Sequence, residues 1–225
     1  MLFAPLRLCS DNLSQRMKMA EFADLPERRA TGRIAEIYDE IRIYGGVPYV
    51  SSLQRQLATI PGCLEWVWDA VRPSFIDGRV PRAAWGAVED LDLPSIAPMP
   101  RPALRVLGVD AIGEAALHSI YATFLRASPV NMVTASLMVC MLEGLPTPQK
   151  KPLGDDMPTW QPPSPPQALP PFPKDKELGP DIRKLLELFE VDMDGVRFVP
   201  GLYRLLAHWP QYLAHVAVEI VPLLQ

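Results

Sequence analysis

The stretch that decides the fold runs from Gly46 to Pro73 and reads GVPYVSSLQRQLATIPGCLEWVWDAVRP. Residues 195–222 read GVRFVPGLYRLLAHWPQYLAHVAVEIVP, and the two stretches agree at 11 of 28 positions when they are aligned without a gap. The offset of 149 residues is far longer than a solenoid repeat of roughly 20–50 residues. The sequence therefore predicts two homologous halves in one chain.

The repeat divides the sequence into four predicted parts. We expect residues 1–28 to be a disordered or non-native extension, 29–145 a first helical repeat, 146–180 a connector, and 181–225 a second, incomplete repeat. The connector holds 12 prolines in 35 residues, a density that excludes a helix or a central strand. The predicted fold class is all-α, with two pseudo-symmetric halves and a site in a cleft at the axis that relates them. A homodimer could cover the incomplete second half.

Apolar periodicity and turn residues predict the individual helices. Thr31 is the expected cap of a helix with Ile34, Ile37, Tyr38 and Ile41 on one face, ending at Gly45–Gly46. Further helices are predicted from Ser51 or Ser52 to Ala58, from 62 to 71 before Pro73, from 82 to 90, from a cap at Asp110 onward, from 130 to 142 after Ser128–Pro129, from 181 to 189, from 200 to 208 and from 210 onward.

Composition narrows the classes of partner. The net charge is −4 and no run of Lys or Arg exceeds two residues, which argues against a nucleic-acid surface. The longest apolar run, 131–142, is shorter than the roughly 20 residues of a membrane span, so no membrane partner is expected. Cys9, Cys63 and Cys140 form no CxxC pair, so we interpret them as reduced thiols of a cytoplasmic protein without a metal site.

Several polar and aromatic residues are candidates for a site, each with a structural alternative. Asn131 lies in an otherwise apolar helix, so its amide either braces a neighbouring segment or contacts a ligand. Arg55 and Arg204, one per copy, form either an anion clamp or helix-end contacts. Trp66 either packs on a neighbouring helix or walls a pocket. The aligned pair of aromatic residues, Tyr49 and Phe198, completes the candidate substrate-binding set.

Together these features resemble the group I 2-haloacid dehalogenases over about residues 30–222. The residues that carry the resemblance are TGRIAEIYDEIR (31–42), the VPYV turn (47–50), RQLATIPGCLEWVW (55–68), SPVNM (128–132) and YRLLAHWPQYL (203–213). Their order, spacing and duplication make the match specific, although no short motif is diagnostic.

The resemblance implies an all-α protein of two similar halves that hydrolyses 2-halocarboxylic acids. In that family an aspartate activates a water that attacks the carbon bearing the halogen, without a metal or organic cofactor. Asn131 matches the asparagine near the attacking water. The aspartate is expected between the second extended turn and the Arg204 helix, but residues 199–203 contain no carboxylate, and the nearest candidates are Asp192 and Asp194. The alternative function is that of a catalytically inactive member that binds a small carboxylate or another protein.

Overall fold

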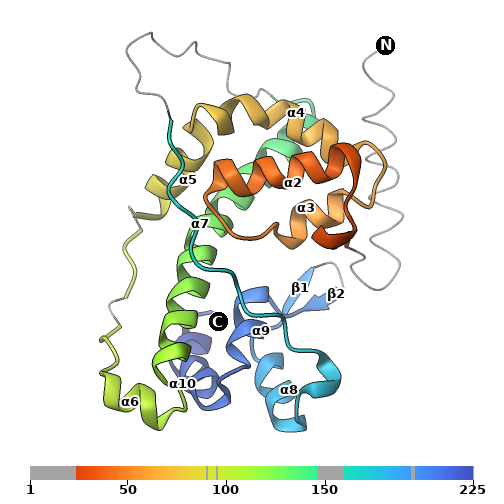
Figure 1. Cartoon of the computed structure of the whole chain (residues 1–225). Coiled ribbons are helices and arrows are strands. Elements are labelled where there is room, and N and C mark those ends of the chain that lie inside the picture. Colours follow the sequence, from red (N-terminus) through yellow and green to blue (C-terminus); the bar gives the residue numbers. More distant parts are fainter. Residues whose placement is uncertain (1–23, 90, 95, 146–159, 194–195, 225) are drawn as a thin grey trace. The chain divides into compact units, whose positions relative to one another are not determined.

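The structure is a computed structural model of the 225-residue chain, and it describes residues 24–89, 91–94, 96–145, 160–193 and 196–224. Most of these residues are helical (Figure 1), which confirms the all-α class in its broad form. The α-helices are α2 (Gly32–Gly45), α3 (Ser52–Leu57), α4 (Cys63–Ile76), α5 (Arg79–Glu89), α6 (Arg101–Val106), α7 (Ala111–Leu142), α8 (Pro180–Glu187), α9 (Gly201–Leu206) and α10 (Pro210–Ile220). Single 3-10 turns are η1 (Glu27–Arg29), η2 (Asp175–Glu177) and η3 (Val221–Leu223), and the strands are β1 (Val191–Met193) and β2 (Val196–Phe198).

The chain forms two compact units, each with its own hydrophobic core. The first unit comprises Met1–Asp92 and Leu125–Pro166, and the second comprises Leu93–Phe124 and Gln167–Gln225. Helix α7 therefore contributes its C-terminal part to the first unit and its N-terminal part to the second. Residues 93–124, which belong to the predicted first repeat, pack in the second unit.

Helix α2 buries the face that its sequence predicts. Ile37, Tyr38 and Ile41 are buried in the first core, and the helix ends at the predicted glycine pair, with Gly46 as its C-cap. Thr31 is the N-cap residue, but its side chain makes no capping hydrogen bond. The apolar face, rather than the cap, therefore fixes this helix in place.

Helix α4 passes through Pro73, although the sequence predicted that it would end before this residue. A proline within a helix removes the hydrogen bond to the carbonyl four residues earlier, here that of Asp69. Asp69 is exposed, so water can satisfy this carbonyl, while Val71 and Phe75 anchor the last turns of the helix in the first core. Burial on either side of the proline outweighs the single lost hydrogen bond.

Helix α7 is one continuous helix, which corrects the prediction of separate helices before and after Pro129. Pro129 removes the hydrogen bond to the Leu125 carbonyl, and the Trp85 indole N–H donates to the neighbouring Arg126 carbonyl at 3.0 Å. Side chains of the N-terminal part of α7 are buried in the second core, and side chains of its C-terminal part are buried in the first. With 32 residues, α7 is also long and apolar enough for a membrane span by length and composition, a test that core helices of soluble proteins pass as well.

Two short elements were not predicted from the sequence. Helix α6 has six residues and no buried side chain, so it carries no apolar periodicity. Strands β1 and β2 form an antiparallel hairpin in which Val191 pairs with Phe198, and three residues per strand are too few for a recognisable alternation. Both elements lie outside the helices that the sequence predicted.

The second core is built around α8, α9, α10 and the N-terminal part of α7. Leu205, Leu206 and Leu213 are fully buried, and the Phe189 ring stacks on Tyr203 with centroids 4.0 Å apart. Helix α9 begins and ends 149 residues after α3, since 201 − 52 and 206 − 57 both equal 149. This is the offset of the sequence alignment.

The described part of the proline-rich connector, from residue 160 onward, runs mainly extended and contacts each unit locally. In the first unit the Trp160 ring lies 5.9 Å from that of Trp85, and the Arg126 guanidinium donates to the Ser164 carbonyl at 2.7 Å. In the second unit the hydroxyl of Ser119 donates to the Gln167 carbonyl at 2.5 Å. Residues 146–159 lie outside the described part of the chain.

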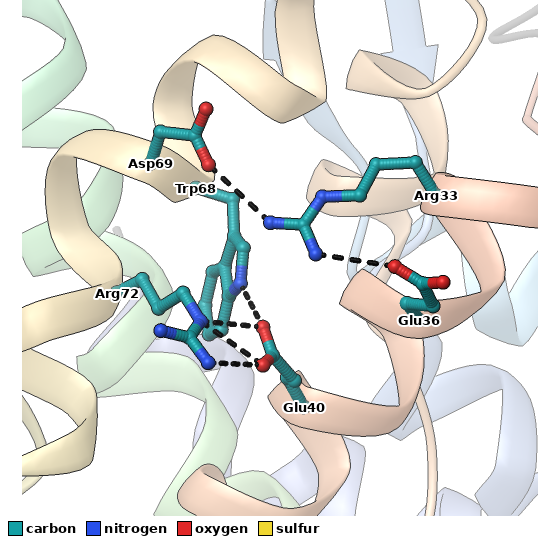
Figure 2. A network of polar contacts seen from close by, with 6 residues as sticks. All are labelled: Arg33, Glu36, Glu40, Trp68, Asp69 and Arg72. Carbon is teal, nitrogen blue, oxygen red and sulfur yellow. Dashed lines mark hydrogen bonds and ion pairs between the residues drawn. The ribbon is translucent and has the colours of Figure 1, made fainter.

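A network of charged side chains ties α2 to α4 on the surface of the first unit (Figure 2). Glu40 receives two hydrogen bonds from Arg72 Nε, at 3.0 and 2.8 Å, one from Arg72 Nη2 at 2.6 Å, and one from the buried Trp68 indole at 2.7 Å. Hydrogen bonding by Arg72, and then by Trp68, holds the pKa of Glu40 below its ordinary value. The carboxylate therefore satisfies a core tryptophan and an arginine together.

We expect Glu40→Gln to lower the free energy of unfolding by about 1 kcal/mol, because Arg72 is partly exposed and its hydrogen bonds are screened. The pKa of Glu40 is lower in the folded state than in the unfolded chain, so its contribution is complete above the unfolded pKa and is lost as the pH falls through the folded pKa. Urea unfolding at neutral and acidic pH measures this. The matched change Glu36→Gln, at a carboxylate 66% exposed, should leave stability unchanged; equal losses in both variants would contradict the assignment.

A second prediction concerns Gly78 and Gly62, which have nearly the same left-handed backbone, with φ of 73° and 75°. A Cβ at Gly78 would overlap the Trp160 indole, whereas a Cβ at Gly62 would meet no atom within 4 Å. Gly62→Ala should cost about 1–2 kcal/mol from backbone strain, and Gly78→Ala about 1–3 kcal/mol more from displacement of Trp160. Thermal unfolding of the two variants measures the difference, and equal losses would show that Trp160 does not pack there.

Candidate functional site

Three polar side chains in the first unit form a connected group, which we call the amide cluster: Ser51, Gln54 and Asn131. The amide nitrogen of Gln54 donates to Asn131 Oδ1 at 2.8 Å, and the hydroxyl of Ser51 donates to Gln54 Oε1. Ser51 and Gln54 are buried, with exposed fractions of 7% and 6%. The cluster joins the start of α3 to α7 across 77 residues of sequence.

In the structure the oxygen of the Asn131 amide faces Gln54. Its oxygen accepts from Gln54, and its nitrogen has no hydrogen-bond partner among the described residues, so two N–H donors remain for a ligand or a water. Ser51 is the N-cap residue of α3, yet its hydroxyl bonds to Gln54 instead of capping the backbone. One turn after Asn131, the buried hydroxyl of Thr134 donates to the Val130 carbonyl at 2.9 Å. The Asn131 N–H groups can therefore hold a polar atom of a ligand by donating hydrogen bonds to it.

Both candidate arginines have carboxylate partners. Arg55 Nη2 lies 2.9 Å from Asp24, and Arg204 Nη2 lies 3.0 Å from Asp175. In each case the aspartate comes from the segment that precedes the repeat. An anion clamp would have to displace these aspartates. The contacts seen are ion pairs rather than the helix-end contacts of the structural alternative, and a role in substrate binding stays a prediction.

The two aromatic candidates of the first unit, Trp66 and Tyr49, are partly buried. Trp66 is half-buried and packs against the first core, as the core-packing alternative expects. Burial raises the pKa of Tyr49 to about 12, with the nearby charge of Arg55 acting in the opposite direction. Tyr49 therefore stays protonated, and a hydroxyl donor, throughout the physiological range of pH.

The remaining candidates lie in or beside the hairpin of the second unit. Asp192 pairs with Arg197 across the two strands, and the closest side-chain atoms are 3.9 Å apart. Its side chain is 57% exposed, and it lines a shallow pocket beside the Phe189–Tyr203 stack. Phe198 is half-buried at the end of β2. Asp194 lies outside the described residues.

The structure therefore brings Asn131 together with two side chains that the sequence did not single out. No local signal in the sequence pairs Gln54 with Asn131. Asn131, Arg55, Trp66 and Tyr49 belong to the first unit, whereas Asp192, Arg204 and Phe198 belong to the second. Within the described ranges, no group of three or more His, Cys, Asp or Glu residues is arranged to hold a metal ion.

No family model and no curated protein matches this sequence. Solved structures do match it. A D-2-haloacid dehalogenase mutant in complex with D-2-CPA superposes with a TM-score of 0.61 at 19% identity, covering 92% of this chain and 72% of that one. A D-2-haloacid dehalogenase mutant gives 0.64 at 18% identity, covering 91% and 72%, and the enzyme in complex with L-LA gives 0.63 at 18%, covering 92% and 72%.

The likeness at this level of identity concerns the fold. It agrees with the resemblance carried by the repeated helices and the SPVNM segment (128–132) of the sequence. The chain thus has the helical fold of the D-2-haloacid dehalogenases.

Proposed function

We propose that the protein is a dehalogenase-like hydrolase that acts on small 2-halocarboxylic acids, with the Asn131 amide as a donor at its site. The observation that carries this proposal is the hydrogen bond from Gln54 to Asn131, within a fold shared with D-2-haloacid dehalogenases. The resemblance assigns this asparagine to the neighbourhood of the attacking water, and the amide cluster orients its N–H groups for that role. A cytoplasmic location is part of the proposal.

We also propose that the fold arose by internal duplication. The common offset of α3 and α9 supports this, because both ends of the two helices match the ungapped sequence alignment. The arginine pairs support it as well: Arg55 and Arg204 are aligned, and each bonds an aspartate upstream of its own repeat. Occurrence in both copies points to an architectural role for these pairs.

The proposed reaction replaces the carbon–halogen bond with a carbon–oxygen bond. A water oxygen attacks the 2-carbon, the halide departs with the bonding electrons, and a carboxylate takes the proton of the water. The Asn131 N–H groups hold the water or the substrate in line for the attack. Asp192 and Asp194 are the carboxylates proposed for the proton transfer.

A second function, binding of a small carboxylate without hydrolysis, is favoured by the state of Asp192. A general base benefits from a site that excludes water. The Asp192 carboxylate is instead exposed on a two-stranded hairpin and forms an ion pair with Arg197. In this alternative, Asn131 still donates to the ligand and no bond is broken.

Halide release from D- and L-2-chloropropionate tests the first function. We expect Asn131→Ala to lower the rate by about 100-fold, the usual effect of removing one donor to a developing charge. Met132→Ala, at the exposed neighbouring position on α7, is the matched control and should keep the rate of the unaltered protein. If the unaltered protein releases no halide, the hydrolase proposal fails, and calorimetric titration with 2-chloropropionate then tests the binding alternative.

Replacement of each candidate carboxylate by an amide identifies the residue that accepts the proton of the water. Asp192→Asn or Asp194→Asn should abolish halide release, while the other variant and the control Asp181→Asn, at an exposed position on α8, should keep it. The change keeps the size of the side chain but removes the proton acceptor. Full activity in both variants would exclude these two residues from the mechanism.

A further inference from the structure

A pocket of about 480 Å³ lies within the second unit and is lined by none of the residues proposed for hydrolysis. Its walls come from α7, α9, α10 and residues 96–104. More than half of the lining residues are aliphatic, among them Leu117, Leu206 and Val216. A volume of this size suits a small organic molecule with an apolar body.

Besides Tyr203 of α9, six polar side chains line the pocket in two matching sets. They are Glu114, His118 and Tyr121 on α7, and Tyr212, His215 and Glu219 on α10. On α7, His118 lies three residues before Tyr121, and Glu114 lies four residues before His118. On α10 the order is reversed: His215 lies three residues after Tyr212, and Glu219 lies four residues after His215. Steps of three and four residues keep each set on one face of its helix. The pocket thus has a tyrosine end and a glutamate end on both walls.

The tyrosine end offers a hydrogen-bond donor. The hydroxyl oxygens of Tyr121 and Tyr212 are 3.0 Å apart, so one hydroxyl donates to the other. The hydrogen of the accepting hydroxyl is not used in this bond. Burial, and then the bond to Tyr212, raises the pKa of Tyr121, so Tyr121 stays protonated and uncharged.

The glutamate end carries one negative charge without an ion-pair partner. Glu114 is bound by Arg105 at 2.9 Å and by Arg101 at 3.1 Å. Glu219 has no ion pair among the described residues, and it lies one residue before the end of α10, where the helix dipole adds negative potential. Two arginines balance the charge of Glu114, so the group of this end that favours a cation is the unpaired Glu219 carboxylate.

We propose that this pocket binds a hydrophobic amine, with the ammonium group at Glu219 and the apolar body along the aliphatic walls toward the tyrosine pair. A carboxylic acid of the same shape would place its negative charge against Glu219. The pocket would therefore select a ligand class opposite in charge to the substrate of the proposed hydrolase.

Calorimetric titration of the full chain with three probes of similar shape tests this inference. The probes are 2-phenylethylamine, 2-phenylethanol and 3-phenylpropionate. We expect the amine to bind tightest and the carboxylate weakest. Comparable binding of 3-phenylpropionate and the amine, or no binding of the amine, would overturn the proposal.

Two variants assign the binding to this pocket. Glu219→Gln should weaken binding of the amine about two- to fivefold, the range of a partly exposed ion pair, and leave binding of the alcohol unchanged. Glu219 is exposed, so folding should not depend on it, and circular dichroism checks this. Glu187→Gln, at an exposed glutamate of α8 outside the pocket, should change neither affinity. Undiminished binding of the amine by Glu219→Gln would contradict the assignment.

Discussion

The packing of one face of helix α7 into the two cores is the constraint on which the rest of the structure depends. This helix is apolar around most of its circumference, and it buries Leu117 and Ile120 in one core and Val130 and Met138 in the other. Each such side chain stabilises the fold by about 1.5–3 kcal/mol, whereas a proline within a helix costs about 3 kcal/mol. Burial on both sides of Pro129 therefore exceeds the cost of keeping the helix continuous. It also explains why the two units are interleaved along the sequence.

Local sequence patterns predicted the elements whose stabilisation is itself local. Helices α2 and α3 follow from apolar spacing and flanking turn residues, and both were placed to within about two residues, the usual uncertainty of helix ends. The rules for proline failed at Pro73 and Pro129, because packing on both sides of each proline decides whether the helix continues. Such packing depends on residues distant in sequence, so a local pattern does not contain it.

In the candidate site, too, the sequence predicted what a local pattern carries and missed what depends on residues distant in the chain. The SPVNM segment (128–132) was sufficient to single out Asn131, but its partner Gln54 lies 77 residues earlier and carries no local signal. The carboxylate partners of Arg55 and Arg204 come from irregular segments, where no periodicity relates them to the arginines. Positions that align in the sequence also differ in their contacts: Gln54 joins the amide cluster, while the aligned Tyr203 stacks on Phe189 and lines the pocket of the second unit.

The anchoring of the connector has a consequence for how its sequence can vary. Proline has no N–H group, and the described connector is held through its carbonyls: Ser164 accepts from Arg126, Gln167 from Ser119, and Pro171 from the His208 ring at 2.9 Å. Carbonyls belong to every amino acid, so these three positions can change during evolution without loss of the contact, provided that the chain stays extended. Selection should act instead on the donors and on connector side chains that make contacts of their own, such as Trp160, which packs through its ring, and Asp175, which pairs with Arg204.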